Sequence, residues 1–201
     1  DMDIRGAGNL LGDEQSGHVR EVGFELYQEM LEEAIAKMKA GEMEGLTDTD
    51  EHWSPQINLG VPVLIPADYV TDLDVRLGLY RRLSGLSKKV ELEGFAAELI
   101  DRFGKLPAEV NMLLRIVRIK GMCRAAGIAK LDGGPKGVVL QFRNNKFASP
   151  EKLVTFLQDQ RGTAKVKDNK IVVRRDWEND DKKIKGAYII ARDLAVLAKG
   201  K

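Results

Sequence analysis

The longest regular pattern of apolar residues lies near the start of the chain and predicts an amphipathic helix over residues 18–40. Apolar side chains recur there every three or four positions, which is the spacing of one helix face. Gly41 follows the last of them and predicts the end of this helix. The preceding residues 1–17 contain four glycines, which disfavour a helix, so this segment is expected to be a loop.

A strand followed by three helices is predicted for the middle of the chain. The apolar run at 57–65 favours a strand, and Pro62 places it at a sheet edge or a bend because proline lacks an N–H. Asp72 is a plausible N-cap for a first helix. The three helices are expected over 73–86, over 89–103 with Gly104 as the stop, and from Pro107 to about Gly127. The first helix is expected to bury Leu73, Leu77, Tyr80 and Leu83 or Leu86.

Shorter apolar runs separated by turn residues predict a small sheet in the last third of the chain. The dipeptide Asp168-Asn169 favours a two-residue hairpin turn. The expected elements are strands at 128–131 and 138–142, a helix at 149–160, a hairpin at 165–173 and a helix at 181–198 that buries Ile184, Tyr188, Ala191, Leu194 or Ala195, and Ala198. The predicted fold class is α+β, with about five helices and a small, mainly antiparallel sheet after an N-terminal loop and helix.

These patterns divide the chain into three parts. Residues 1–41 hold the loop and the first helix, and residues 42–56 are polar and acidic with Pro55 near the end, which is typical of a linker. Residues 57–201 are expected to form the compact domain.

The charge of the chain is unevenly distributed, although its net value is only +1. Residues 1–56 hold 14 acidic and 4 basic residues, whereas residues 105–201 hold 22 basic and 10 acidic residues. A basic half of this kind can meet nucleic acid or an acidic protein surface, and it can also be a solvated surface that keeps a domain soluble. The asymmetry suggests two parts with different partners.

Residues that could carry out chemistry are scarce. One cysteine, Cys123, and two histidines are too few for a usual zinc site, and Cys123 lies among apolar residues, where a small buried side chain is expected. No Walker A sequence occurs, and the glycines of residues 6–12 have the wrong spacing for a dinucleotide loop. We therefore expect no catalytic residue, no metal site and no enzyme activity in this segment.

The location of the protein can also be predicted from composition. No apolar run approaches the roughly 18 residues that span a bilayer, and the first residues do not form a secretory signal. A single cysteine excludes an internal disulfide and fits a reducing compartment. A cytoplasmic protein with no membrane partner is expected. The chain starts with Asp1 rather than methionine, so we expect it to be part of a longer protein.

Two sets of motifs resemble a known family. Residues Asp3–Gly17, followed by Val22–Tyr27, resemble the motif beyond the second motor lobe of RecG-type DNA translocases. Residues 64–66, 76–83 and 98–107 resemble the C-terminal domain of the bacterial transcription-repair coupling factors. The resemblance covers about residues 1–125 well and is weaker after Gly127.

The resemblance implies a function for the parent protein. Members of this family are ATP-dependent translocases that act on duplex DNA, displace stalled RNA polymerase and recruit the excision-repair nuclease through its A subunit. ATP and Mg would bind upstream in the parent chain, so no cofactor is expected in this segment. The terminal domain would act as an autoinhibitory clamp that docks on the parent's N-terminal repair-factor-binding module and hides the surface used by the A subunit.

The resemblance also assigns candidate residues, with 1–41 as the tail of the motor lobe and 57–201 as the regulatory domain. The translocation motif would comprise Arg5, Gly6, Gly8, Gln15 and Gly17, in which Arg5 and Gln15 exchange hydrogen-bond partners as the lobes move. Intramolecular docking would use Glu98, Asp101 and Arg102. Glu98 and Asp101 are three residues apart, which places them on one face of the predicted helix.

An alternative function and a possible self-association remain open. The basic half, 105–201, could form a nucleic-acid-binding accessory domain, which would need aromatic side chains between the basic ones on a sheet face. The candidates are Phe142, Phe147, Phe156 and Trp177, although Phe142 and Phe156 fall on apolar faces and favour a core role. The apolar stripe of helix 18–40 could also join two copies of this segment as a dimer.

Overall fold

The computed structural model describes residues 53–199, and residues 1–52 and 200–201 lie outside the described part. The predicted loop and helix of 1–41, nearly all of the linker and the translocation motif with Arg5, Gly6, Gly8, Gln15 and Gly17 therefore lie outside it. Contacts divide the described residues into two compact units. The helical unit comprises 61–86 and 90–114, and the sheet unit comprises 53–60, 87–89 and 115–199.

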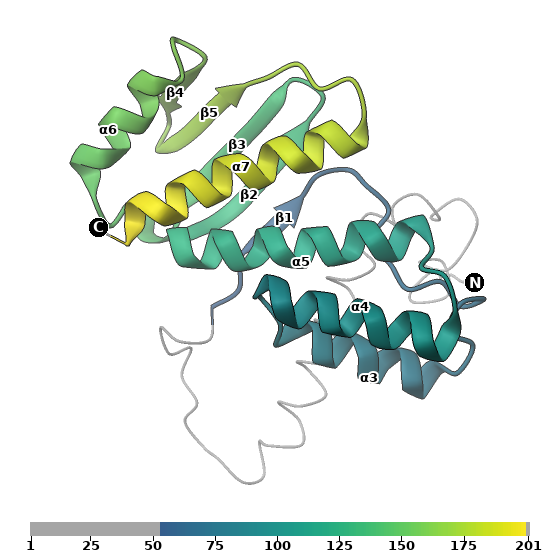
Figure 1. Ribbon diagram of the computed structural model, residues 1–201. Coiled ribbons are helices and arrows are strands. Elements are labelled where there is room, and N and C mark those ends of the chain that lie inside the picture. The colour runs from purple at the N-terminus through teal and green to yellow at the C-terminus, as the bar shows by residue number, and fades with distance from the viewer. Residues whose placement is uncertain (1–52, 200–201) are drawn as a thin grey trace, which may run out of the picture. The chain divides into compact units, whose positions relative to one another are not determined.

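The helical unit contains one complete helix, a second helix except for its first residue, and the beginning of a third (Figure 1). They are α3 (Leu73–Ser84), α4 (Lys89–Phe103) and α5 (Ala108–Ala126), of which α5 continues into the sheet unit. The side chain of Asp72 accepts a hydrogen bond from the Val75 N–H at 3.0 Å, which confirms the predicted N-cap. The buried side chains of this unit are Val61, Val63, Ile65, Val70, Leu79, Tyr80, Leu83, Leu92, Phe95, Leu99, Val110, Leu113 and Leu114.

The segment that precedes α3 is held by polar contacts rather than by a sheet. The buried Tyr80 hydroxyl accepts the backbone N–H of Ile65 at 2.7 Å. The Tyr69 hydroxyl donates to the carbonyl oxygen of Gly104 at 2.7 Å, and Arg76 donates to the carbonyl oxygen of Val70 at 2.8 Å. These bonds fix the turn at residues 66–70 against the ends of α3 and α4.

The sheet unit contains a five-stranded mixed sheet and two helices of its own. The strand order is β1-β2-β3-β5-β4, in which β1 pairs with β2 in parallel and the other neighbours are antiparallel. The elements are β1 (Gln56–Asn58), β2 (Ile128–Gly134), β3 (Gly137–Phe142), the short helix η2 (Arg143–Asn145), α6 (Pro150–Asp159), β4 (Ala164–Lys167), β5 (Lys170–Arg174) and α7 (Asp180–Ala198). With α3 to α5, the described residues confirm the predicted α+β class with five helices and a mainly antiparallel sheet.

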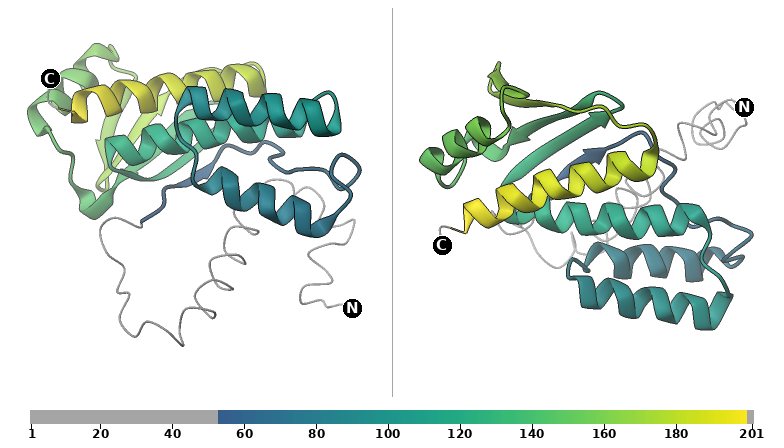
Figure 2. Two further views of the ribbon diagram at one scale, coloured as in Figure 1. Left: turned by 60° about the horizontal axis from the view of Figure 1, so that its bottom comes forward. Right: turned by 45° about the horizontal axis from the view of Figure 1, so that its top comes forward.

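One face of the sheet is apolar and covered. Figure 2 shows α7 and the second half of α5 on the same side of the strands. The buried side chains on this side of β1, β2, β3 and β5 are Ile57, Leu131, Val138, Leu140, Ile171 and Val173. Val166 of the edge strand β4 is on the same side but is 59% exposed. Buried residues of the two helices face them, including Ile119, Cys123, Ile184 and Leu194. The strict alternation along β3 and β5 is that of strands with a single covered face.

The β4–β5 hairpin has the predicted two-residue turn. Asp168 and Asn169 have positive φ angles of 53° and 62°, which is the conformation of a type I′ turn. Lys167 and Lys170 therefore pair directly across the turn. The predicted hairpin is confirmed.

Three expectations about individual elements are wrong. The strand predicted over 57–65 is limited to Gln56–Asn58, because Gly60 takes a φ of +65° and Pro62 has no N–H to donate. Leu73 is 51% exposed, since the buried stripe of α3 runs through Leu79, Tyr80 and Leu83 instead. In α7, Tyr188 and Ala198 are only partly buried, whereas Lys183 is buried.

The buried Lys183 forms an ion pair with Asp180 and lies near Gly60, which follows β1. Its Nζ lies 3.2 Å from Oδ1 of Asp180, one turn earlier in the same helix. The same ammonium group lies beside Gly60: a Cβ added at this glycine would be 3.7 Å from Lys183 Nζ. The stem of Lys183 thus packs in the core while its charged end stays paired.

Candidate functional site

The outer face of α4 carries an exposed strip of small and apolar residues. Val90 is 71% exposed and Ile100 is 50% exposed. Gly94 and Ala97 lie between them and are also exposed. A Cβ added at Gly94 would meet no atom within 4 Å, so the strip is open at its centre. Small residues at this spacing allow another element to approach the helix backbone closely.

A cluster of three charged side chains borders this strip. Arg82 of α3 and Glu98 of α4 form two hydrogen bonds, Nη1 to Oε2 at 2.6 Å and Nη2 to Oε1 at 2.8 Å. Arg102, one turn after Glu98, donates to the same Oε2 at 3.0 Å. The carboxylate of Glu98 thus accepts hydrogen bonds from two guanidinium groups.

The two arginines lower the pKa of the carboxyl group that joins them. Hydrogen bonds from Arg82 and then from Arg102 lower the pKa of Glu98 from 4.5 to about 2. The hydrogen bond to Glu98 in turn raises the pKa of Arg82. The Arg82 guanidinium carbon also lies 5.1 Å from the centre of the Phe95 ring, and that of Arg102 lies 4.8 Å from the Phe103 ring. Glu98 and the two rings hold both arginines at defined positions on the surface.

The three predicted docking residues lie close together, but they have different surroundings. Glu98 and Arg102 contact each other, whereas Asp101 is exposed and forms no ion pair with any of residues 53–199. Arg82 was missed by the sequence analysis because it belongs to another helix, 16 residues before Glu98. Arg82 lies between Arg81 and Leu83 on an exposed part of α3, and these neighbours gave no sign of its partner on α4.

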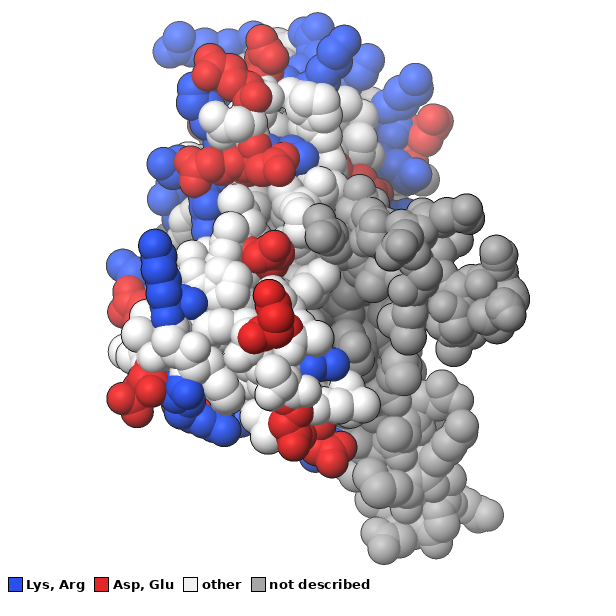
Figure 3. All heavy atoms as spheres, turned by 90° about the vertical axis from the view of Figure 1, so that its right-hand side faces the viewer, with Lys and Arg blue, Asp and Glu red and all other residues white. Residues whose placement is uncertain are grey.

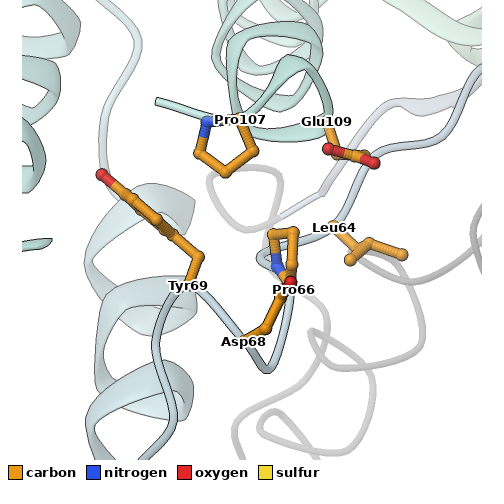
Figure 4. Close-up of a pocket in the computed structure, with 6 residues that line it drawn as sticks. All are labelled: Leu64, Pro66, Asp68, Tyr69, Pro107 and Glu109. Atoms are coloured by element: carbon orange, nitrogen blue, oxygen red, sulfur yellow. The ribbon is translucent and has the colours of Figure 1, made fainter. Parts of the chain in front are cut away.

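A hollow of about 370 Å³ lies near the turn before α3. It is lined by Leu64, Pro66, Asp68, Tyr69, Pro107 and Glu109. Figure 4 shows Tyr69 on one side of it and Leu64 and Glu109 on the other, with the two proline rings between them. The lining combines the carboxylates of Asp68 and Glu109 with Leu64 and two prolines, which suits a basic or apolar side chain.

The single cysteine and the candidate metal ligands can be located in the described part of the chain. Cys123 is fully buried, and burial raises the pKa of its thiol to about 12. This result confirms the expected role of Cys123 as a small core residue. Among residues 53–199, no group of three or more His, Cys, Asp or Glu side chains could hold a metal ion. No helix within these residues is long and apolar enough to cross a membrane.

The aromatic residues expected for a nucleic-acid-stacking surface belong mainly to the core. Phe142, Phe147 and Phe156 are all buried, and the rings of Phe142 and Phe147 pack at 4.9 Å. Trp177 is partly buried and packs against Gly186 of α7. The core interpretation of Phe142 and Phe156 is confirmed, and Phe147 is buried as well, so these three rings do not form a base-stacking surface.

Known proteins resemble the chain in sequence and in fold. The TRCF domain family matches residues 59–153. The transcription-repair-coupling factor of Rickettsia bellii is 49% identical over 173 residues, which cover 86% of this chain. That of Escherichia coli K12 is 41% identical over 160 residues, which cover 80% of the chain. The chain belongs to the transcription-repair-coupling factor family.

A solved structure shows the same fold. The crystal structure of a transcription-repair coupling factor C-terminal domain aligns with a TM-score of 0.60 and 20% sequence identity. The alignment covers 74% of this chain and 96% of that one. The chain spans only 15% of the length of the Rickettsia transcription-repair-coupling factor and 14% of that of the Escherichia coli protein. The family assignment predicted from the motifs is confirmed.

Proposed function

We propose that this segment is the autoinhibitory regulatory module of an ATP-dependent DNA translocase that displaces stalled RNA polymerase. In this proposal, the domain docks on the N-terminal repair-factor-binding module of the same parent chain. Docking covers the surface through which the parent recruits the A subunit of the excision-repair nuclease. The observation that carries the proposal is the exposed strip of α4 beside the cluster of Arg82, Glu98 and Arg102.

The strip supplies the apolar contact that a docking surface needs. Exposed ion pairs contribute only about 0–1 kcal/mol each, so the stability of a docked state rests mainly on buried apolar area. Val90 and Ile100 offer such area, while Gly94 and Ala97 let a partner backbone approach. A tether within one chain provides an effective concentration on the order of millimolar, so a modest surface is sufficient.

The charged residues give the surface its orientation. Glu98 holds Arg82 and Arg102, and their remaining N–H groups are available for carboxylates on the partner. Asp101 offers a carboxylate of its own to a basic residue of the partner. The proposed role of Glu98 is thus to position two arginines rather than to bind a partner arginine directly.

The parent protein supplies the remaining activities in this proposal. ATP, Mg and duplex DNA bind upstream modules, and the segment 57–201 regulates them without being an enzyme. Residues 1–41 form the tail of the motor lobe, in which Arg5 and Gln15 respond to lobe movement, and 42–56 form the linker. The motor and its regulator act in the cytoplasm, where the transcribed DNA is.

Isothermal titration calorimetry of the 201-residue chain against the isolated N-terminal module of its parent tests the docking. Ala97→Arg places a long charged side chain in the middle of the strip, and Asp101→Lys reverses the charge beside it. Each is expected to weaken binding at least about tenfold, which corresponds to 1.4 kcal/mol. Asp159→Lys on α6 is the matched control, with the same change in net charge away from α4, and it should bind as the wild type does.

Two outcomes would count against the proposal. Equal weakening by Asp101→Lys and Asp159→Lys would show that net charge, rather than the α4 face, determines the binding. Absence of binding by the wild-type chain at millimolar concentration would remove the docked state altogether.

A further inference from the structure

The second face of the five-stranded sheet is open and carries a concentration of positive charge. The register of the strands places eleven side chains on this face, and none of them is buried. They are Gln56 and Asn58 of β1, Lys130 and Asp132 of β2, Val139 and Gln141 of β3, Lys170, Val172 and Arg174 of β5, and Lys165 and Lys167 of β4. We call this surface the open sheet face.

The open sheet face has five cations and one carboxylate. Asp132 lies 3.7 Å from the neighbouring Lys130, so its charge is offset locally. Within residues 53–199, Lys165, Lys167 and Lys170 form no ion pair with a carboxylate. The adjacent turn and loops add Arg161 and Arg175, together with the carboxylates of Asp159, Asp168 and Asp176. In Figure 3, Lys and Arg side chains are numerous over the upper part of the described residues, with Asp and Glu side chains between them.

The positions of these cations suit a long polyanion. Neighbouring strands lie about 4.8 Å apart, so the charged face extends roughly 19 Å from β1 to β4. Lys167 and Lys170 are cross-strand partners, and Lys130 is paired with Gln141 and Gln56 farther along the sheet. Like charges placed directly opposite destabilise a sheet, so their presence in the β4–β5 hairpin favours an anionic ligand that neutralises them.

The neutral residues of the open sheet face indicate which polyanion it binds. Its neutral polar groups are the amides of Gln56, Asn58 and Gln141, and amide side chains are among those that hydrogen-bond phosphate and sugar oxygens in protein–DNA complexes. Surfaces that bind single strands use aromatic side chains on which bases stack. The open sheet face carries no Phe, Tyr or Trp, because the aromatic residues of this unit belong to its core, its loops or α7.

We propose that the open sheet face binds the phosphate backbone of duplex DNA without reading its sequence. Lys165, Lys167, Lys170 and Arg174 contact phosphates, and Lys130 extends the contact toward β1. This surface lies on other residues than the α4 strip, so its DNA binding is independent of the docking proposed above. Sequence-independent binding through a few phosphates is weak, with dissociation constants on the order of 10⁻⁴–10⁻⁶ M at physiological salt.

Fluorescence anisotropy of a labelled random-sequence duplex, titrated with the 201-residue chain, tests this proposal. The triple variant K165Q/K167Q/K170Q removes three cations of the open sheet face. The matched triple K105Q/K185Q/K199Q removes three exposed lysines elsewhere and has the same net charge. Each phosphate contact contributes about 0.9 to the slope of log Kd against the logarithm of the salt concentration. The first triple should therefore lower this slope by roughly 2–3. At about 50 mM salt its affinity should fall at least tenfold, whereas the matched triple should stay within about threefold of the wild type.

Several results would overturn the proposal. Equal losses in the two triples would assign the binding to net charge, and no binding of the wild type at low salt would exclude a DNA surface. Tighter binding of the single strand than of the duplex would contradict backbone recognition of duplex DNA. Equal competition by polyglutamate of the same charge would assign the open sheet face to an acidic protein partner instead. Circular dichroism of both triples checks that the sheet remains folded.

Discussion

Arg82 and Glu98 join the two helices of the α3–α4 pair through a bidentate ion pair, with N–O distances of 2.6 and 2.8 Å. Arg102 completes the cluster at 3.0 Å from the same carboxylate. The side chains of Arg82, Glu98 and Arg102 remain 50%, 34% and 43% exposed. A pair with this geometry and exposure contributes little to folding, so its main consequence is the fixed orientation of two arginines beside the α4 strip.

The first prediction concerns the pH dependence of this cluster. Because its pKa falls from 4.5 in the unpaired state to about 2 in the folded chain, Glu98 stabilises the fold above about pH 4.5 and loses this effect as the pH falls through 2. Glu98→Gln should cost no more than about 1 kcal/mol at neutral pH, since the pair is exposed. The difference between the two proteins, followed by thermal unfolding, should shrink across this pH range. A Glu98 carboxyl that titrates at its ordinary value in an NMR experiment would contradict the paired geometry.

The second prediction concerns the hydrogen bond that ties residue 65 to α3. Tyr80→Phe leaves the buried N–H of Ile65 without its acceptor, which should cost about 1–3 kcal/mol in the free energy of unfolding. Tyr188→Phe is the control, since the Tyr188 ring contacts Arg118 and Arg192 through its face and keeps these contacts as phenylalanine. Urea unfolding measures both. Equal stability of the two variants would show that the Tyr80 hydroxyl does not hold this segment.

The third prediction compares two helical glycines. A Cβ at Gly186 would lie 2.5 Å from atoms of the Trp177 ring, whereas a Cβ at Gly78 of α3 would meet nothing within 4 Å. Gly78→Ala should therefore stabilise the protein by up to about 1 kcal/mol through helix propensity. Gly186→Ala should destabilise it or displace Trp177, which tryptophan fluorescence would report. A stabilising Gly186→Ala with unchanged fluorescence would contradict the packing of Trp177 on α7.

The fourth prediction concerns Cys123. Burial raises the pKa of its thiol to about 12, so almost no thiolate exists at neutral pH and the sulfur is closed to solvent. A thiol reagent should leave the native chain unlabelled and label it fully in denaturant. Rapid labelling under native conditions would place Cys123 outside the core.

Local sequence signals predicted most elements of the fold correctly. The helix over 89–103 has the predicted bounds because Gly104 ends it with a φ of 91°, which other residues rarely adopt. The β4–β5 hairpin followed from Asp168-Asn169 in the same way. Both features depend on a few neighbouring residues, which is why the sequence alone was sufficient.

Features that depend on residues distant in sequence were not predicted. The pairing of Arg82 with Glu98 depends on the packing of α3 on α4, and the open sheet face depends on a register shared by five strands. The basic composition of 105–201 suggested nucleic acid, yet the aromatic residues named for it are mostly buried. The burial of Lys183 likewise depends on the approach of Gly60, which follows another element.

The central proposal, that the α4 strip hides a repair-factor surface, is tested most directly in the intact parent protein. The measurement is the affinity of the excision-repair nuclease's A subunit for the parent, with and without Ala97→Arg, and with Asp159→Lys as the control. If docking masks the A-subunit site, Ala97→Arg should raise this affinity at least tenfold and the control should leave it unchanged. An unchanged affinity for the Ala97→Arg parent, despite weakened docking in calorimetry, would contradict the masking role of this domain.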